Sequence, residues 1–178
     1  MKRITLTFIL LLMILGTNLF AQKANYTEKH GRTLNLGSGI GGYSGYYGYI
    51  GRTLPVLHIN YEFDVANNFT LAPFATFYTY RGDNYRETVI PVGVKGTFYF
   101  DQLLRANSNW DFYLAGSLGF AIVNSAWDTD YHGDRNYWHN PGPLFLDIHV
   151  GAEYHLNNQL GVFLDLSNGV STIGLAIH

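Results

Sequence analysis

Two stretches of the chain alternate strictly between bulky apolar and polar residues. Between residues 57 and 65, every second residue is bulky and apolar or aromatic, and the residues between are His58, Asn60, Glu62 and Asp64. The same alternation returns over residues 144–156. Side chains on a strand point alternately to opposite faces, so each stretch has one apolar face and one ionisable face. This pattern favours a barrel with lipid outside and a polar interior.

Weaker alternation divides the rest of the chain into further strands. The eight predicted strands cover about residues 33–41, 54–65, 69–80, 88–100, 110–123, 144–156, 160–166 and 172–178. The third has aromatic residues on both faces, so its pattern does not say which face is apolar. Tyrosine, phenylalanine and glycine are abundant, at 14, 12 and 20 residues, which suits strands and tight turns. We predict an all-β, closed, eight-stranded antiparallel up-and-down barrel.

The links between these strands differ in length. Residues 66–68 and 157–159 form short asparagine-rich turns, whereas residues 42–53, 81–87 and 124–143 form longer links. Outer-membrane barrels alternate short periplasmic turns with longer outer loops, so this order predicts a periplasmic N-terminus. Two links depart from the order: residues 101–109 are long for an inner turn, and residues 168–171 are short for an outer loop.

The first 21 residues have the layout of a secretory signal. Lys2 and Arg3 precede an apolar run over residues 4–15, and cleavage is expected after Ala21. The alternative is an N-terminal membrane anchor, for which the apolar run is short. We predict a signal peptide over residues 1–21, a short periplasmic lead-in over residues 22–32 and the barrel over residues 33–178.

Charge and composition exclude several classes of protein. Without Lys2 and Arg3, nine basic and thirteen acidic residues remain and no basic patch stands out, so nucleic acid is not an expected partner. The absence of cysteine excludes disulfides, thiolate metal sites and cysteine nucleophiles. No segment after residue 21 is long and apolar enough for a membrane-spanning helix, so the chain would cross a membrane as a closed sheet.

A secreted lipocalin-like carrier of an apolar ligand is the main alternative fold. It would turn the apolar face inward, but eight strands enclose only enough space for tightly packed side chains. The polar face combines small residues with ionisable ones, which would fill a narrow interior well. These ionisable residues are Glu62, Lys95, Asp147, His149, Glu153 and Asp165. A lipid-facing apolar surface therefore fits the sequence better.

The strand count, the asparagine turns and the final stretch with Gly169, Ser171 and Gly174 resemble the small outer-membrane β-barrel family of gram-negative bacteria, of the OmpA/OmpX kind. The resemblance implies an outer-membrane location, a monomer, surrounding lipid and lipopolysaccharide, insertion by the barrel-assembly machinery and often no assigned activity. Members commonly end on an aromatic residue, whereas this sequence ends on His178.

Three segments invite a chemical interpretation. Residues 165–169 are similar to the catalytic stretch of outer-membrane lipid A deacylases, but Asp165 occupies the histidine position and no glutamate follows Ser167, so we predict a turn. Asp130, His132, Asp134 and His139 could ligate a divalent cation, but their spacing matches no defined site and favours a solvated outer loop. The tyrosine-rich residues 41–51 favour a surface loop, with an adhesive role as the alternative.

Aromatic residues also gather near the predicted inner ends of the strands, where an interfacial girdle belongs. They are Tyr61, Phe63, Phe98, Phe100, Trp110 and Tyr154. We predict an outer-membrane barrel with a structural or surface-interaction role that presents a possible ligand site on its outer loops. No catalytic, cofactor-binding or metal-binding residue is predicted. A lipid A-modifying hydrolase or acyltransferase remains the alternative function.

Overall fold

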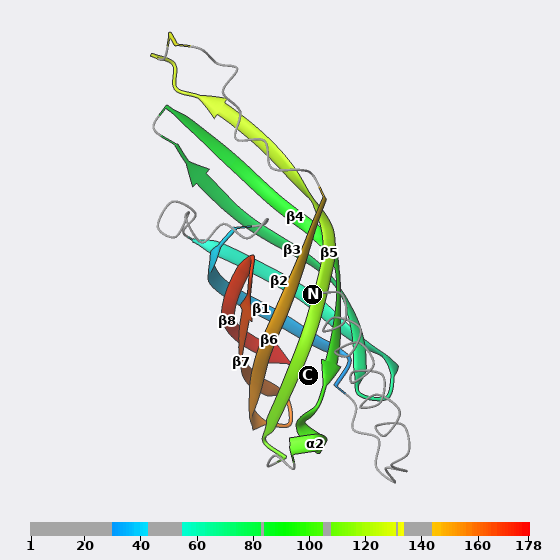
Figure 1. Ribbon diagram of the computed structural model, residues 1–178. Coiled ribbons are helices and arrows are strands. Elements are labelled where there is room, and N and C mark those ends of the chain that lie inside the picture. Colours follow the sequence, from blue (N-terminus) through cyan, green and yellow to red (C-terminus); the bar gives the residue numbers. More distant parts are fainter. Residues whose placement is uncertain (1–29, 43–54, 83, 105–107, 131, 134–143) are drawn as a thin grey trace, which may run out of the picture.

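Eight antiparallel strands form a closed barrel in which each strand pairs with its neighbours in sequence and β1 pairs with β8 (Figure 1). The computed structural model describes residues 30–42, 55–82, 84–104, 108–130, 132–133 and 144–178. The strands are β1 (Thr33–Gly41), β2 (Val56–Ala66), β3 (Phe69–Arg81), β4 (Tyr85–Tyr99), β5 (Trp110–Trp127), β6 (Leu144–Asn157), β7 (Leu160–Ser167) and β8 (Val170–Ile177). The predicted fold and all eight strands are confirmed. The predicted signal peptide lies outside the described residues.

The apolar faces point outward and the ionisable faces point inward. Ile59, Leu118 and Ile148 expose 45%, 55% and 64% of their surface. Glu62, Lys95 and Asp147, on the alternate positions of β2, β4 and β6, expose at most 5%. A soluble carrier would show the reverse arrangement, so the lipocalin alternative does not fit this barrel.

One end of the barrel carries the short connections around residues 66–68 and 157–159 and the link over residues 101–109. We call this end the turn rim. Asn68 adopts the left-handed conformation with φ of 56°, and Asn157 Oδ1 accepts a 2.8 Å hydrogen bond from the amide of Gln159. These contacts confirm the two predicted asparagine turns. The longer link over residues 101–109 contains the short helix α2 (Asp101–Leu104), which the alternation pattern did not predict. Strand β1 begins and β8 ends at this same rim (Figure 1).

At the opposite end, strands β3, β4 and β5 extend well past the others (Figure 1). Arg81, residues 85–87 and residues 124–127, expected to lie in loops, instead belong to these strands, with Arg81 paired with Arg86 and Tyr85 with Trp127. The loop prediction was wrong here because aromatic packing replaces the apolar alternation. The Tyr85 ring lies 5.1 Å from that of Trp127 and 6.0 Å from that of Tyr80. We call this extension the projecting sheet.

The interior is layered along the barrel axis. Val56, Tyr78, Val89 and Phe145 form a buried apolar cluster on the side of the projecting sheet. Tyr99, Tyr113 and Ala115 form a second cluster nearer the turn rim. Most of the buried ionisable residues lie between these clusters or nearer the turn rim, and Glu87, which is 2% exposed, lies beyond Val89 toward the projecting sheet. Within the described residues, no helix is long and apolar enough to cross a membrane.

Candidate functional site

The centre of the barrel holds a buried ionic network around Asp165 on β7. Lys95 Nζ lies 2.6 Å from Asp165 Oδ2, and His149 Nδ1 lies 2.7 Å from Asp165 Oδ1. The Tyr113 hydroxyl donates a further hydrogen bond of 3.1 Å to Oδ2. All four residues are at most 9% exposed. Three donors on one carboxylate satisfy its charge in an interior that would otherwise penalise it.

Ser117 on β5 extends this network in the hydrogen-bond order of a serine–histidine–aspartate triad. Its Oγ lies 2.9 Å from His149 Nε2, while the opposite ring nitrogen of His149 contacts Asp165. The Asp165 carboxylate accepts from Nδ1–H, so Nε2 is left to accept the proton of the Ser117 hydroxyl. The sequence pattern did not identify this arrangement because its members come from three different strands. Their shared inward positions were the available signal.

The space around Ser117 is too small for a lipid substrate. Ser117 is 3% exposed and borders a cavity of about 30 Å³, which is also lined by Phe74, Phe145 and Asp147. A buried water needs roughly 10–15 Å³ measured in this way, so the cavity suits one or two waters. Asp147 Oδ1 has no hydrogen-bond partner among the described residues, and such a water would satisfy it. The buried cluster of Val56, Tyr78, Val89 and Phe145 lies toward the projecting sheet, and the Tyr99–Tyr113 cluster lies nearer the turn rim.

Ser167, compared above with a lipid deacylase serine, lies in a tight turn. Its hydroxyl donates to the Val170 carbonyl at 2.9 Å and accepts from the Gly169 amide at 2.9 Å. Asn168 Oδ1 accepts from the amide of Ile148 at 2.7 Å. Ser167 therefore holds the β7–β8 connection, which confirms the predicted turn.

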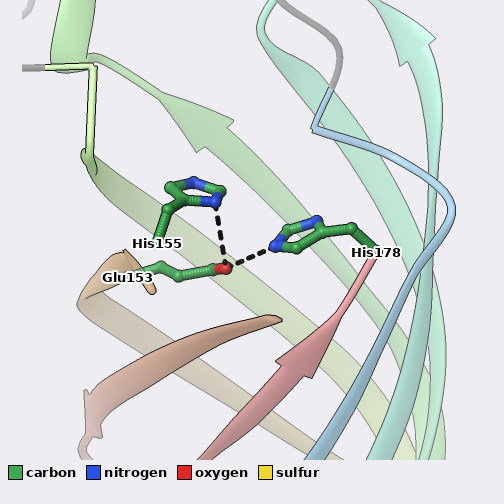
Figure 2. A group of neighbouring side chains, drawn as sticks. All are labelled: Glu153, His155 and His178. Carbon is green, nitrogen blue, oxygen red and sulfur yellow. Dashed lines mark hydrogen bonds and ion pairs between the residues drawn. The ribbon is translucent and has the colours of Figure 1, made fainter. Parts of the chain in front are cut away.

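A second polar group lies at the turn rim, where Glu153 and His155 on β6 meet His178 after β8 (Figure 2). We call these three residues the rim cluster. Glu153 Oε1 lies 2.7 Å from His178 Nε2 and 3.9 Å from His155 Nδ1. The two imidazole rings are stacked with centroids 4.9 Å apart. The side chain of Glu153 is 7% exposed, whereas those of His155 and His178 are 25% and 21% exposed, so the cluster opens to solvent.

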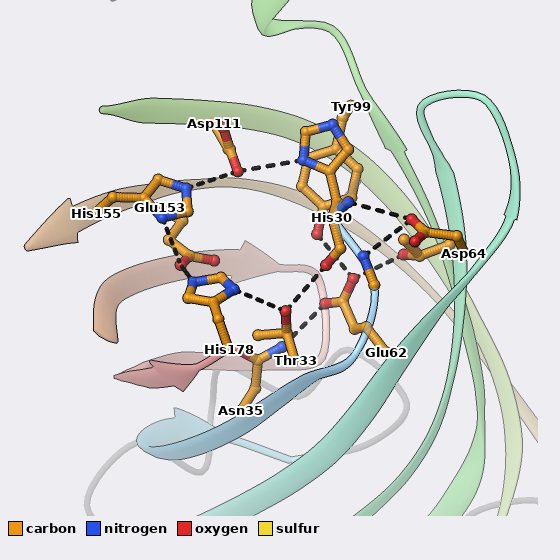
Figure 3. Close-up of polar contacts among 12 residues, drawn as sticks. His30, Thr33, Asn35, Glu62, Asp64, Tyr99, Asp111, Glu153, His155 and His178 are labelled. Atoms are coloured by element: carbon orange, nitrogen blue, oxygen red, sulfur yellow. Dashed lines mark hydrogen bonds and ion pairs between the residues drawn. The ribbon is translucent and has the colours of Figure 1, made fainter. Parts of the chain in front are cut away.

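On each histidine, the ring nitrogen opposite the one that lies toward Glu153 contacts a neighbouring side chain (Figure 3). His155 Nε2 lies 2.9 Å from Asp111 Oδ2, which also lies 3.3 Å from His30 Nδ1. His178 Nδ1 lies 2.9 Å from Thr33 Oγ1. The sequence pattern did not single out this group, since its members lie on separate strands and no spacing motif joins them.

Residues 30–32, predicted as an aperiodic lead-in, pack into the barrel end. The His30 ring stacks on Tyr99 with centroids 3.9 Å apart, and the amides of His30 and Gly31 donate to Asp64 Oδ1 at 3.1 and 2.9 Å. The Tyr99 hydroxyl donates to Glu62 at 2.7 Å. This segment therefore helps to close the lumen at the turn rim.

The loop residues considered above as possible cation ligands form no site within the described residues. Asp130 and His132 are exposed, and neither belongs to the one metal-compatible group found within the described residues. Asp134 and His139 lie outside the described residues, as does the tyrosine-rich segment from residue 43 onward.

The outer surface carries an apolar zone with defined limits. On β5 it runs from the aromatic Trp110 to Ile122, which is about 40 Å along the strand and about 30 Å along the axis at the usual tilt. Beyond Ile122 the outward positions become polar at the paired residues Thr79, Thr88 and Asn124. At the turn rim the Trp110 ring lies 4.9 Å from that of Tyr154. Tyr61, Phe63 and Phe98 also face outward, as the predicted girdle requires, and Phe100 is half-buried.

Comparison with solved structures shows a protein with a similar fold. The crystal structure of neisserial surface protein A (NspA) matches with a TM-score of 0.54 at 13% identity, over 82% of this chain and 94% of that one. This chain shares its fold with NspA. The apolar zone is about as tall as the hydrocarbon layer of a bilayer, so the barrel spans a membrane with this zone in contact with lipid.

Two further structures match this barrel less well. A de novo designed transmembrane β-barrel gives a TM-score of 0.49 at 13% identity, over 84% of this chain and 98% of that one. The Yersinia pestis outer membrane protein Ail in a phospholipid bilayer nanodisc gives 0.45 at 10% identity, over 82% and 96%. No protein-family model and no curated protein matches the sequence.

Proposed function

We propose that this outer-membrane barrel is not an enzyme and has a structural or surface-interaction role. The filled lumen is the observation that supports this role most strongly. The central cavity of about 30 Å³ has no room for an acyl chain, and the charged groups around it are engaged with one another. The parts of the barrel that a partner can reach are therefore its ends and its outer surface.

The hydrolase alternative has one specific observation in its favour, the order Ser117–His149–Asp165. A fluorophosphonate probe, which reacts with activated serines, tests it directly on the folded barrel in detergent. We expect no labelling of Ser117 and an unchanged lipid A profile in cells that carry Ser117→Ala. Ser167→Ala serves as the matched control. Covalent labelling that is lost in Ser117→Ala alone would establish a reactive serine and contradict the non-catalytic role.

Two arginines on the projecting sheet support lipopolysaccharide as a surface partner. Arg81 and Arg86 are paired directly opposite each other on β3 and β4, and both are exposed. Like charges in this position repel, so a bound anion would relieve the repulsion. They lie two residues beyond the polar row of Thr79 and Thr88, at the level expected for headgroups. Insertion by the barrel-assembly machinery and a monomeric state belong to the same proposal.

Binding to lipopolysaccharide can be compared with binding to a neutral lipid. We expect lipopolysaccharide to raise the urea midpoint of unfolding above that in phosphatidylcholine, and we expect Arg81→Gln with Arg86→Gln to remove most of this difference. Arg32→Gln is the control, because Arg32 is exposed at the turn rim. If the double variant keeps the full difference, the arginines do not carry the interaction.

A further inference from the structure

The rim cluster brings three electron-pair donors together. Glu153 Oε1, His155 Nδ1 and His178 Nε2 all lie within 4.8 Å of one another (Figure 2). Two imidazoles and one carboxylate form a common ligand set for divalent transition metals. The donors of a tetrahedral zinc site lie roughly 3.3 Å apart, since each bond is about 2.0–2.1 Å long. The observed separations of 2.7 and 3.9 Å from Glu153 lie on either side of that value.

The groups behind the histidines determine where their ring protons lie. Asp111 Oδ2 is a carboxylate oxygen and accepts the proton of His155 Nε2, which leaves a lone pair on His155 Nδ1 toward Glu153. Thr33 Oγ1 donates its single proton to the His30 carbonyl at 3.0 Å, so it accepts the proton of His178 Nδ1. The lone pair on His178 Nε2 then also faces Glu153. Three lone pairs therefore converge, and a positive charge among them, from a metal ion or a proton, would offset their repulsion.

These backing contacts also match the usual surroundings of metal-bound histidines. A histidine ligand commonly donates its other N–H to a carboxylate, hydroxyl or carbonyl, which fixes the ring and raises its basicity. Asp111 does this for His155, and Thr33 does it for His178 (Figure 3). Within the described part of the chain, no lysine or arginine forms an ion pair with Asp111 or Glu153. With the contacting histidines neutral, the two carboxylates leave a negative charge that a divalent ion would neutralise.

We propose that Glu153, His155 and His178 bind one divalent transition-metal ion of the zinc class at the turn rim. The ion has three protein ligands, and the partial exposure of both histidines leaves its remaining position open to water. Because β6 and β8 are not adjacent in the sheet, the ion also links two strands across the barrel end. This site is independent of the surface role proposed above, which involves the opposite end of the barrel.

Zinc binding to the intact barrel tests this site. The chain is isolated without an added histidine tag, folded in detergent, freed of metal with a chelator and titrated with zinc chloride in a calorimeter. We expect one ion per chain. Glu153→Gln, His155→Gln and His178→Gln should each weaken binding at least tenfold, whereas His132→Gln, an exposed histidine away from this rim, should bind like the unaltered chain. Thr33→Val keeps all three ligands but removes the contact to His178 Nδ1 together with the hydrogen bond to the His30 carbonyl, and it should weaken binding roughly 10- to 100-fold.

Cobalt(II) gives a readout that does not depend on any variant folding. We expect the unaltered chain to develop the intense visible absorption of a four-coordinate cobalt site at one equivalent and to lose it when zinc is added. Folding of each variant is checked by its heat-modifiable gel mobility. Absence of zinc binding, or equal binding by a folded His178→Gln chain, would overturn the proposal. The lone pairs would then be satisfied by a proton on His178, which makes an imidazolium–carboxylate pair with Glu153.

Discussion

Lys95 Nζ on β4 and Asp165 Oδ2 on β7 lie 2.6 Å apart and join two strands that are not neighbours in the sheet. Both residues are at most 5% exposed. A buried charge is tolerated only when a partner compensates it, so each of these groups depends on the other. The ion pair therefore links β4 and β7 across the interior of the barrel.

Removing one member of this pair should destabilise the barrel strongly. Lys95→Met leaves the Asp165 carboxylate with only His149 and Tyr113, and we expect a loss of about 3 kcal/mol in the free energy of unfolding. Urea unfolding in lipid bilayers, followed by tryptophan fluorescence, measures it. The double variant Lys95→Met/Asp165→Leu should lose less than Lys95→Met, because no uncompensated charge remains. A double variant less stable than the single one would argue against this account.

Gly151 on β6 provides space for the ring of Tyr113. A methyl group at Gly151 would collide with that ring, and Gly151→Ala should cost about 1–3 kcal/mol while displacing the Tyr113 hydroxyl from Asp165. Gly116→Ala is the matched control, since its methyl group would meet only the Asp147 carbonyl at 3.9 Å. We expect the control to change the unfolding free energy by less than about 0.5 kcal/mol. Equal effects of the two substitutions would show that Tyr113 does not need this space.

The limit of the apolar zone can be tested with arginine substitutions on one strand. Leu118 on β5 is 55% exposed near the middle of the zone, so Leu118→Arg should cost roughly 2–4 kcal/mol in bilayers. Ala126→Arg places the same side chain on the same face beyond Asn124 and should cost less than about 1 kcal/mol. Unfolding in phosphatidylcholine vesicles compares the two. A large cost at Ala126 would mean that lipid extends over the projecting sheet.

The depth of the two described tryptophans should differ. Trp110 belongs to the aromatic group at the turn rim, and Trp127 lies on the projecting sheet beyond the polar row. Brominated lipids quench tryptophans in or near the hydrocarbon, so a variant that retains only Trp110 should be quenched at least twofold more than one that retains only Trp127. Equal quenching would contradict the assigned position of the barrel in the membrane.

The fold could be predicted from the sequence because the alternation of apolar and polar residues follows directly from the strand geometry. Where the lumen is polar, as on β2 and β6, the pattern identified both the strands and the inward face. The pattern predicted β3 as a strand but did not identify its inward face, since Phe74 and Tyr78 fill the interior while Phe77 faces outward. The pattern also placed the end of β5 too early. The last residues of β5 do not continue the apolar alternation, although Trp127 is paired with Tyr85 on β4 and their rings are in contact.

The polar groups could be predicted singly but not as sites. The inward positions of His149, Asp165 and Glu153 follow from alternation alone. Their partners Ser117, His155 and His178 depend on the relative heights of strands around the barrel, which are set by register and closure. A sequence with no spacing motif does not contain that information in a readable form, so neither the buried triad nor the rim cluster was expected.

The pairing of β1 with β8 has a consequence for assembly. Because β1 is the first strand in the chain and its partner β8 is the last, one edge of β1 has no hydrogen-bonding neighbour until the barrel closes. An edge of this kind readily accepts a foreign strand. A factor that inserts the protein would therefore have to pair temporarily with this edge of β1 until β8 replaces it. Mutations at the β1–β8 seam should slow insertion more than they destabilise the folded barrel.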